Sequence, residues 1–346
     1  MRINFAMWKK AFSSLVKMES IEEWRSLDVI SKWLIATRSG VTMVTLYTCA
    51  IGGILAWRDG YLHPLVWLII TLGLFLAHGT NNLLNDYTDF SRGIDSLGYF
   101  RIQYGVHPLY QKFWDKKTQL TWFAISGTLA FLSGVFALIY TQFSVEIITL
   151  FTFGIVILFF YTWPLKHIAL GELCIFLIWG PVMAAGVYLV MAGGMVDTVW
   201  QAALAAVPFG LSVVSINIGK HIDKSAEDRV KKVGTLPVVI GEKTARYINM
   251  AALILIYLVI LYLIFVTQYF TPVLLIVLFA GKRLLYAVGV HTKPRPEEPP
   301  KEWPAWPTWF SGFAFYHNRL FSNLFVLGLI LDVILRLTLP GFWPAR

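Results

Sequence analysis

The sequence predicts an all-α membrane protein with about nine transmembrane helices. Of its 346 residues, 57% are hydrophobic and 14% are charged, and the mean hydropathy of +0.64 lies outside the range of a soluble globular domain. The apolar residues are concentrated in stretches of roughly 20 residues, the length that an α-helix needs to cross a bilayer. Polar segments separate these stretches, so the chain divides into membrane helices and connecting loops.

Nine apolar stretches meet this length and follow one another through most of the chain. They cover residues 39–57, 64–84, 120–140, 144–162, 170–192, 198–217, 247–266, 271–290 and 320–338. The eighth is the weakest, because Lys282 and Arg283 lie inside it and a charged side chain is costly within the bilayer. We expect these two side chains to reach the interface or to face the interior of the bundle. Residues 39–338 are expected to form one domain.

The segments outside the predicted spans have interfacial compositions. Residues 1–38 mix tryptophan and phenylalanine with lysine and arginine. This pattern is typical of an amphipathic helix on the cytoplasmic surface, although a poorly ordered basic tail has the same composition. Residues 291–318 are rich in proline and tryptophan, which exclude a regular helix and favour the headgroup level, so we expect an interfacial loop. Residues 339–346 are expected to form a tail on the outer side.

The distribution of basic residues predicts the orientation of the chain. If the N-terminus is cytoplasmic, then of the 29 Lys and Arg residues only Arg58, Arg336 and Arg346 fall on the outer side. Such an excess of positive charge on one face predicts a cytoplasmic N-terminus, an outer C-terminus and an odd number of spans. The net charge of +9 is therefore explained by orientation and by attraction to anionic lipid. Nucleic acid is not expected as a partner.

Two clusters of carboxylates and amides follow predicted spans, and ionised groups at the end of a membrane segment mark a functional site by default. In the first cluster, Asn82, Asn85, Asp86 and Asp89 share one helical face if the span continues as a helix. Asp95 follows a glycine and can fold back towards that face. Several oxygen ligands on one face suit Mg²⁺, which binds through one or two carboxylates together with phosphate oxygens. We therefore expect a magnesium–diphosphate site.

The second cluster follows the sixth predicted span and mixes acids with bases. Asp223, Glu227 and Asp228 are candidates for holding a second metal ion. Interleaved basic residues can bind diphosphate oxygens directly; they are Lys220, His221, Lys224 and Arg229. Both clusters open long polar loops on the same membrane face, although about 130 residues separate them. We expect the two clusters to share one site.

Further residues are weaker candidates for a direct role. Histidines such as His107 and His221 are more often hydrogen-bonded loop residues than metal ligands or bases. Arg38 precedes the first span, where it is explained by topology or reaches into a cavity on the cytoplasmic side. Arg92, at the end of the first cluster, is a candidate for binding diphosphate. Tyr161 is a weak candidate at the end of the fourth predicted span.

The first cluster and later patches of the chain resemble the UbiA superfamily of intramembrane prenyltransferases. The residues of the first cluster are most similar to the branch that prenylates 1,4-dihydroxy-2-naphthoate on the way to menaquinone. The matching patches lie between about residues 38 and 245, in the order of the family. They are Asn82 to Asp95, Tyr161-Thr162-Trp163-Pro164-Leu165, Gly171-Glu172, Trp179-Gly180-Pro181, and Gly234 to Glu242. The resemblance implies an all-helical bundle around a central cavity, which opens to the cytoplasmic side and laterally to lipid.

The resemblance also implies roles for residues of both clusters. Asp86 and Asp89 would bind Mg²⁺ with assistance from Asn82. Asp223 and Asp228 would serve a second Mg²⁺, and a lysine of the second cluster, Lys220, would bind the diphosphate.

The chemistry implied is transfer of a polyprenyl group from an allylic diphosphate to an aromatic acceptor. Mg²⁺ would neutralise the departing diphosphate, and an allylic cation would form in an apolar, water-poor chamber where hydrolysis is suppressed. An electron-rich acceptor ring would then attack this cation. The expected partners are a polyprenyl diphosphate, an aromatic small molecule and membrane lipid. The expected location is the cytoplasmic membrane of a prokaryote, with the site facing the cytoplasm.

The chain departs from the family pattern at two places. The general first motif has an aspartate eight residues after Asn82, where this chain has Phe90, whereas the aspartate at position 89 fits the naphthoate branch. In the second motif the earlier aspartate position falls on Lys224, with Asp223 one residue away. One residue is about 100° of rotation on a helix. Either the local backbone adjusts, or this chain holds diphosphate with a Lys-His-x-Asp-Lys arrangement of its own.

Other functions stay open at this point. The acceptor could be another quinone ring, a tetrapyrrole or a glycerol-phosphate lipid, because acceptor choice depends on the shape of the cavity. A secondary transporter or channel would favour charges near the midplane and broken helices, whereas the acids here lie at the ends of spans. A third alternative is an inactive relative held in a larger complex, which magnesium-dependent turnover would distinguish from an enzyme.

Overall fold

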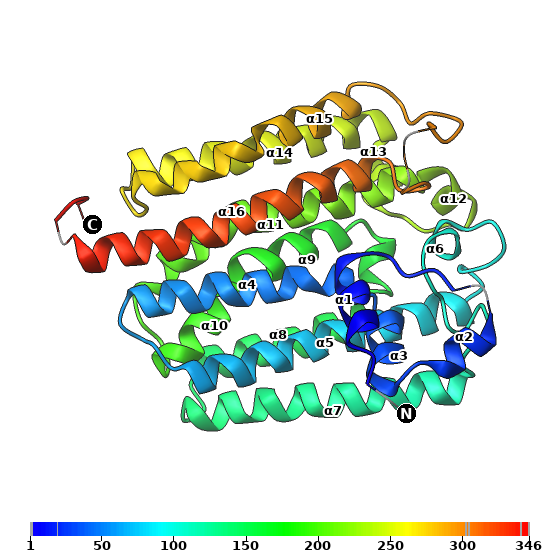
Figure 1. Cartoon of the computed structure of the whole chain (residues 1–346), viewed down its shortest axis with the longest axis horizontal. Helices are drawn as coiled ribbons and strands as arrows, with labels where there is room; N and C mark the ends of the chain where they lie inside the picture. Colours follow the sequence, from blue (N-terminus) through cyan, green and yellow to red (C-terminus); the bar gives the residue numbers. More distant parts are fainter. Residues whose placement is uncertain (1–2, 19, 302, 304, 340, 345–346) are drawn as a thin grey trace.

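The computed structural model is a bundle of α-helices (Figure 1), and it describes residues 3–18, 20–301, 303, 305–339 and 341–344. The long helices are α4 (Ser39–Arg58), α5 (Pro64–Ser91), α7 (Lys116–Tyr140), α8 (Val145–Phe160), α11 (Val199–Asp223), α14 (Glu242–Phe265) and α16 (Phe310–Thr338). Two further spans are composite: α9 (Gly171–Leu177), η2 (Ile178–Val182) and α10 (Met183–Ala192) form one, and η3 (Pro272–Ala280) and α15 (Gly281–His291) form the other. The short helices are α1 (Phe5–Ser13), α2 (Ile21–Ser26), α3 (Val29–Ala36), α6 (Phe100–Gln103), η1 (Leu165–His167), α12 (Ser225–Val230) and α13 (Leu236–Ile240).

Each of the nine predicted spans occurs as a helix, so the predicted fold class is confirmed. Eight of the described helical stretches are long and apolar enough to cross a membrane, judged by length and composition. The other is α8, which is apolar but has 16 residues and therefore a length of about 24 Å. The helix ends differ most from the predicted spans at α5, which continues beyond residue 84 to Ser91, and at α16, which begins at Phe310 and not at residue 320. The extension of α5 makes the first acidic cluster helical, as predicted.

The bundle is centred on α11, which packs against α14, α16, α9 and η2. Its buried side chains include Phe209, and alanine and glycine residues around it allow close approach of neighbouring backbones. One of these close approaches joins Gly210 of α11 to Gly180 of η2, where a Cβ on Gly210 would lie 2.7 Å from the Gly180 Cα. Since backbone atoms cannot move aside as a flexible side chain can, glycine is required at this crossing.

The Gly210→Ala substitution is expected to destabilise the bundle by about 1–3 kcal/mol, because the added methyl group overpacks a fixed backbone contact. The measurement is the thermal unfolding midpoint in detergent, followed by tryptophan fluorescence. Gly154→Ala in α8 is the matched control, because a Cβ at that position meets no heavy atom within 4 Å. Equal midpoints for the two variants would contradict the close approach of α11 and η2.

The N-terminal segment forms three short helices, α1 to α3, in place of one surface helix. Trp24 and Trp33 are buried against residues of α5 and of the loop that precedes α7, including Leu83 and Trp114. Asp28 joins the segment together, because its carboxylate accepts hydrogen bonds from the Ser31 amide at 2.9 Å and the Trp8 indole at 3.1 Å.

The loop between α15 and α16 carries the proline and tryptophan residues of the predicted interfacial segment. Arg295 holds this loop to the end of α11, since it donates to the backbone oxygen of Asp223 at 2.6 Å and to that of Pro307 at 2.8 Å. Trp303 stacks on Phe313 of α16, with ring centroids 4.2 Å apart. The predicted loop is therefore shorter than 291–318, because α16 already begins at Phe310.

The polar loops gather at one end of the bundle. Helix α6, which follows the first acidic cluster, and helix α12, which carries Glu227 and Asp228 of the second, lie at the same end in Figure 1, and the C-terminal end of α16 lies at the other. The last residues of the predicted outer tail, including Arg346, fall outside the described residues. This arrangement places the two clusters, from distant parts of the chain, on one side of the bundle.

Candidate active site

A cavity of about 1240 Å³ lies inside the bundle. Its wall is largely apolar along α7 and α8, where Phe123, Phe131 and Phe151 line it. Its polar end is lined by residues of both acidic clusters and by basic side chains that the fold brings to them. The basic side chains that line this end include Arg38, Arg101, Lys166, Lys220 and Lys224. The cavity therefore combines a positively charged polar end, which we call the mouth, with an apolar chamber.

Asp89, on the last turns of α5, faces this polar end. Its Oδ2 accepts a hydrogen bond from the Lys166 ammonium at 2.6 Å and one from the Asn85 amide at 3.4 Å. The other nitrogen-bound proton of the Asn85 side chain serves Thr162, whose hydroxyl lies 3.1 Å from Nδ2. Asp89 Oδ1 is buried and has no hydrogen-bond partner among the described residues. Asp89 therefore carries one unpartnered carboxylate oxygen at the polar end of the cavity.

Asp86 lies one turn earlier on α5 and is fully buried behind two arginines. Arg101 makes a two-point contact with it, at 3.2 Å from Nε to Oδ1 and 2.6 Å from Nη2 to Oδ2. Arg38 approaches Oδ1 at 3.4 Å and donates to Asn82 at 3.0 Å. Arg38 thus reaches into the cavity, which was one of the two explanations that its position in the sequence allowed.

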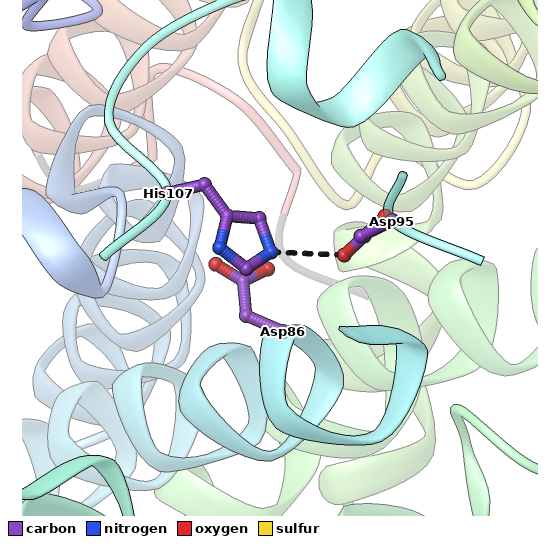
Figure 2. A group of neighbouring side chains, drawn as sticks. All are labelled: Asp86, Asp95 and His107. Atoms are coloured by element: carbon purple, nitrogen blue, oxygen red, sulfur yellow. Dashed lines mark hydrogen bonds and ion pairs between the residues drawn. The ribbon is translucent and has the colours of Figure 1, made fainter. Parts of the chain in front are cut away.

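Asp95 and His107 complete the first cluster (Figure 2). His107 Nε2 lies 3.0 Å from Asp95 Oδ2, and both side chains are buried. One ligand atom each of Asp86, Asp95 and His107 lies within 4.8 Å of the others. Asp95 Oδ1 has no hydrogen-bond partner among the described residues. The turn at Gly93, with a φ of 70°, brings Asp95 back to α5 as predicted.

The second cluster meets the first, as the sequence predicted. Asp228 accepts a hydrogen bond from the Tyr99 hydroxyl at 2.8 Å, across 129 residues of sequence. Glu227 accepts a hydrogen bond from the Phe100 backbone amide at 2.5 Å, so this carboxylate holds the start of α6. Lys231 donates to the Gly93 backbone oxygen at 3.0 Å. The segment that carries α12 is therefore packed directly on the turn that follows α5.

Asp228 forms a buried pair with Lys224. The Lys224 ammonium lies 2.6 Å from each carboxylate oxygen, and Thr235 donates to Oδ2 at 2.9 Å. Burial alone would raise the pKa of Asp228, but the charge of Lys224, followed by that of His221 and by hydrogen bonds, outweighs it and holds that pKa below its usual value. Asp228 is therefore ionised, and it fixes Lys224 and Tyr99 in the cavity wall.

Asp223 points away from the cavity towards the N-terminus of α16. Its carboxylate accepts hydrogen bonds from the backbone amides of Trp309, Phe310 and Ser311 at 2.9–3.0 Å, and from the Ser311 hydroxyl at 2.6 Å. A carboxylate at this position satisfies the free amides of the first helical turn and complements the helix dipole. All four donors belong to one helix start, so Asp223 caps α16 in this structure.

Other predicted residues divide between the cavity and the surface. Lys220 and Tyr161 line the cavity, and in the described chain Lys220 has neither an ion-pair nor a hydrogen-bond partner. His221 also lines it, with Nδ1 held by Glu172 at 2.5 Å. Arg92 is exposed and stacks over Trp163 at 5.2 Å, and Arg229 is also exposed. These two arginines lie outside the cavity lining.

Sequence reasoning missed three residues of the polar end, namely Tyr99, Arg101 and Lys166. Tyr99 and Arg101 follow the first cluster by only a few residues, but nothing in a single sequence marks a loop residue that turns back. Lys166 offered a signal, because it is the one basic residue other than histidine in the short segment 163–169. A single charge between two strongly apolar spans on the predicted cytoplasmic side could have been assigned to the site.

The chain is similar to known proteins of one family. The UbiA prenyltransferase family profile matches residues 45–328. The chain is similar to UbiA prenyltransferase domain-containing protein 1 of Rattus norvegicus, with 26% identity over 240 residues, 68% of each protein. The homologue from Drosophila melanogaster is 24% identical over 235 residues, 65% of this chain and 62% of that protein. These relatives are animal proteins, so they give no support to the expected prokaryotic membrane.

Solved structures share the fold. The apo structure of a UbiA homologue from Aeropyrum pernix K1 has a TM-score of 0.62 and 13% identity, covering 85% of this chain and 98% of that one. A UbiA homologue from Archaeoglobus fulgidus, solved with DMAPP and Mg²⁺, has a TM-score of 0.52 and 13% identity, covering 87% of this chain and 99% of that one. The family profile extends over most of the helical bundle, and the protein belongs to the UbiA prenyltransferase family.

Proposed function

We propose that this protein transfers a prenyl group from an allylic diphosphate to an aromatic acceptor inside the membrane. The observation that carries the proposal is the cavity, whose cationic mouth opens into an apolar chamber. The cationic mouth suits a diphosphate, and the apolar chamber suits an isoprenoid chain. Lys220 is the leading diphosphate ligand, because it lines the mouth without a protein partner, and Lys166 and Lys224 flank it.

The carboxylates of the mouth fit Mg²⁺. Asp89 Oδ1 and Asp95 Oδ1 are buried carboxylate oxygens without hydrogen-bond partners in the described part of the chain. Mg²⁺ prefers carboxylate oxygens together with substrate phosphate oxygens and water. We therefore propose that Asp89 and Asp95 hold the ion, with Asp86 close by, and that His107 orients Asp95. When bound, Mg²⁺ would neutralise the charge that develops on the departing diphosphate.

The protein side chains then have three tasks. Lys166, Lys220 and Lys224 hold diphosphate oxygens as the carbon–oxygen bond to the allylic carbon breaks. The apolar wall of α7 and α8 keeps water from the allylic cation. The acceptor ring bonds to the allylic carbon and then loses the substituent of the attacked carbon, which restores its aromaticity. This substituent leaves as a proton to water where that carbon bears hydrogen, or as carbon dioxide where it bears the carboxylate. Asp228 does not line the cavity itself; it positions Lys224 and Tyr99, which do.

We propose 1,4-dihydroxy-2-naphthoate as the acceptor. The support is the run Asn85-Asp86-Tyr87-Thr88-Asp89, which resembles the naphthoate branch of the family. We also place the mouth at the cytoplasmic face, because the basic loops that form it would otherwise violate the positive-inside rule.

Removing Mg²⁺ is expected to abolish product formation. The purified protein in nanodiscs is given geranylgeranyl diphosphate and 1,4-dihydroxy-2-naphthoate, with Mg²⁺ or with EDTA, and the prenylated product is measured by mass spectrometry. We expect a loss of at least about a hundredfold in EDTA, because the leaving diphosphate then keeps its full charge, and recovery when Mg²⁺ is restored.

Two other outcomes have defined meanings. Release of diphosphate without a naphthoate product would retain the prenyltransferase and reject this acceptor. A well-folded sample that turns over no allylic diphosphate with Mg²⁺ would reject the proposed function.

A further inference from the structure

A polar group lies within the membrane part of the cavity, away from the charged mouth. His78 of α5 lines the cavity, and its Nδ1 lies 2.8 Å from the hydroxyl of Thr45 of α4. The indole of Trp179, in η2, donates to the same hydroxyl at 2.8 Å. The imidazole and indole rings lie 4.7 Å apart. An ionisable side chain inside a membrane helix is costly and is by default a candidate functional group.

The third member of the group stands at a break in a membrane span. Gly180 has non-helical dihedral angles (φ −110°, ψ −115°) and Pro181 follows it. The break changes the helical hydrogen bonding, and the Trp179 carbonyl accepts a hydrogen bond from Thr48 at 3.2 Å. Irregular backbone at membrane depth is tolerated where it is buried or lines a cavity, and such breaks often occur at binding sites. The break here holds Trp179 against the cavity wall.

The hydrogen-bond pattern assigns the tautomer of His78. The Trp179 indole can only donate, so Thr45 Oγ accepts from it. Among the described residues the Thr45 hydroxyl has no acceptor other than His78 Nδ1, so its proton is directed there, and this leaves the imidazole proton on Nε2. Nδ1 is engaged with Thr45, and Nε2 is the remaining polar atom of a ring that lines the cavity. His78 therefore offers an N–H donor to whatever occupies the chamber.

The depth of this donor suits the acceptor ring. His78 is one helical turn below Asn82, about 6 Å along α5, and Asn82 is held by Arg38 at the polar end. The allylic carbon is bonded to the diphosphate, so the attacking ring carbon must lie within about 3–3.5 Å of it, just inside the mouth. The α7–α8 wall suits the isoprenoid chain, whereas His78 and Trp179 line the part of the cavity that α5 and η2 form.

We infer that His78, oriented by Thr45 and Trp179, donates a hydrogen bond to a ring hydroxyl oxygen of the aromatic acceptor and so contributes to the choice of acceptor. The inference rests on the proposed function. His78 binds the acceptor in this scheme, and Thr45 is a positioning residue that acts through it.

The test compares acceptor binding and acceptor KM in variants that keep the size of the side chain. His78→Phe is expected to raise the KM for 1,4-dihydroxy-2-naphthoate roughly tenfold, the value of one hydrogen bond, with the KM for geranylgeranyl diphosphate unchanged. Binding to protein in nanodiscs, measured by calorimetry without diphosphate, adds a readout besides activity. The wild type is expected to prefer 1,4-dihydroxy-2-naphthoate over 2-naphthoate, which has no hydroxyl, and His78→Phe is expected to lose that preference.

Two further variants sharpen the test. His78→Gln retains an N–H donor and is expected to recover part of the preference. Ser133→Ala is the matched control, because Ser133 also lines the cavity but its hydroxyl is bonded to the Ile69 carbonyl at 3.0 Å, and it should bind both compounds as the wild type does.

The outcomes separate the inference from the proposed function. An unchanged preference and acceptor KM in His78→Phe, in a protein that transfers prenyl groups, would overturn the role of His78 and leave the function intact. Equal weakening of both compounds would also overturn it, because the hydrogen bond would not then be to a hydroxyl. A wild-type protein without any transfer would reject the proposed function itself.

Discussion

Replacing Asp89 by asparagine is expected to lower the rate of prenyl transfer about a thousandfold, which corresponds to about 4 kcal/mol of transition-state stabilisation. Asp89 faces the cavity with one oxygen bound to Lys166 and the other without a partner among the described residues. Asparagine retains the shape but loses the charge, so it weakens both the proposed Mg²⁺ site and the hold on Lys166. The measurement is the kcat of product formation across a Mg²⁺ titration.

A second carboxylate at the same end of the bundle provides a matched control. Asp115 is exposed and caps α7 by accepting the Thr118 amide at 2.7 Å. Asparagine caps helices about as well as aspartate does, so Asp115→Asn should keep wild-type activity. If Asp89→Asn retained more than a tenth of the activity, with the same Mg²⁺ dependence as the wild type, the proposed ion site would have to be moved away from Asp89.

The parts of this molecule that could be predicted from the sequence depend on local patterns. Hydrophobic stretches have a length set by the bilayer, and each predicted span is a helix. The shared face of Asn82, Asn85, Asp86 and Asp89 follows from helical periodicity alone, which required only that α5 continue beyond the apolar stretch. The meeting of the two clusters was also predictable, because the two spans end on the same side of the membrane.

The partners of these carboxylates could not be predicted in the same way. Lys166 is 77 residues from Asp89 in sequence, and the Phe310 amide is 87 residues from Asp223. Periodicity gives the face on which a side chain lies but not which distant segment packs on that face. For this reason Asp223 was indistinguishable from a metal ligand in the sequence, whereas in the structure its oxygens are occupied by the start of α16.

Asp223 and Asp228 are therefore expected to differ sharply when each is replaced. Asp223→Ala removes the acceptor of four hydrogen bonds at the start of α16 and should destabilise the fold by about 2 kcal/mol. Asp223→Asn keeps one accepting oxygen and should lose less. Both variants should retain transfer activity per folded molecule well below their unfolding temperatures. The measurements are the thermal unfolding midpoint in detergent and the kcat of the folded fraction.

Asp228→Asn is expected to give the opposite balance, with a loss of activity of roughly a hundredfold, the scale of effects for residues that orient a ligand-binding group. The charge of Asp228 holds the Lys224 ammonium at 2.6 Å in the wall of the cavity, and a neutral amide with one accepting oxygen holds it more weakly. If Asp223→Asn instead abolished transfer without lowering the unfolding midpoint, Asp223 would be a ligand in the working enzyme. The start of α16 would then have to move when substrate binds, because the same two oxygens cannot cap that helix and hold a metal ion together.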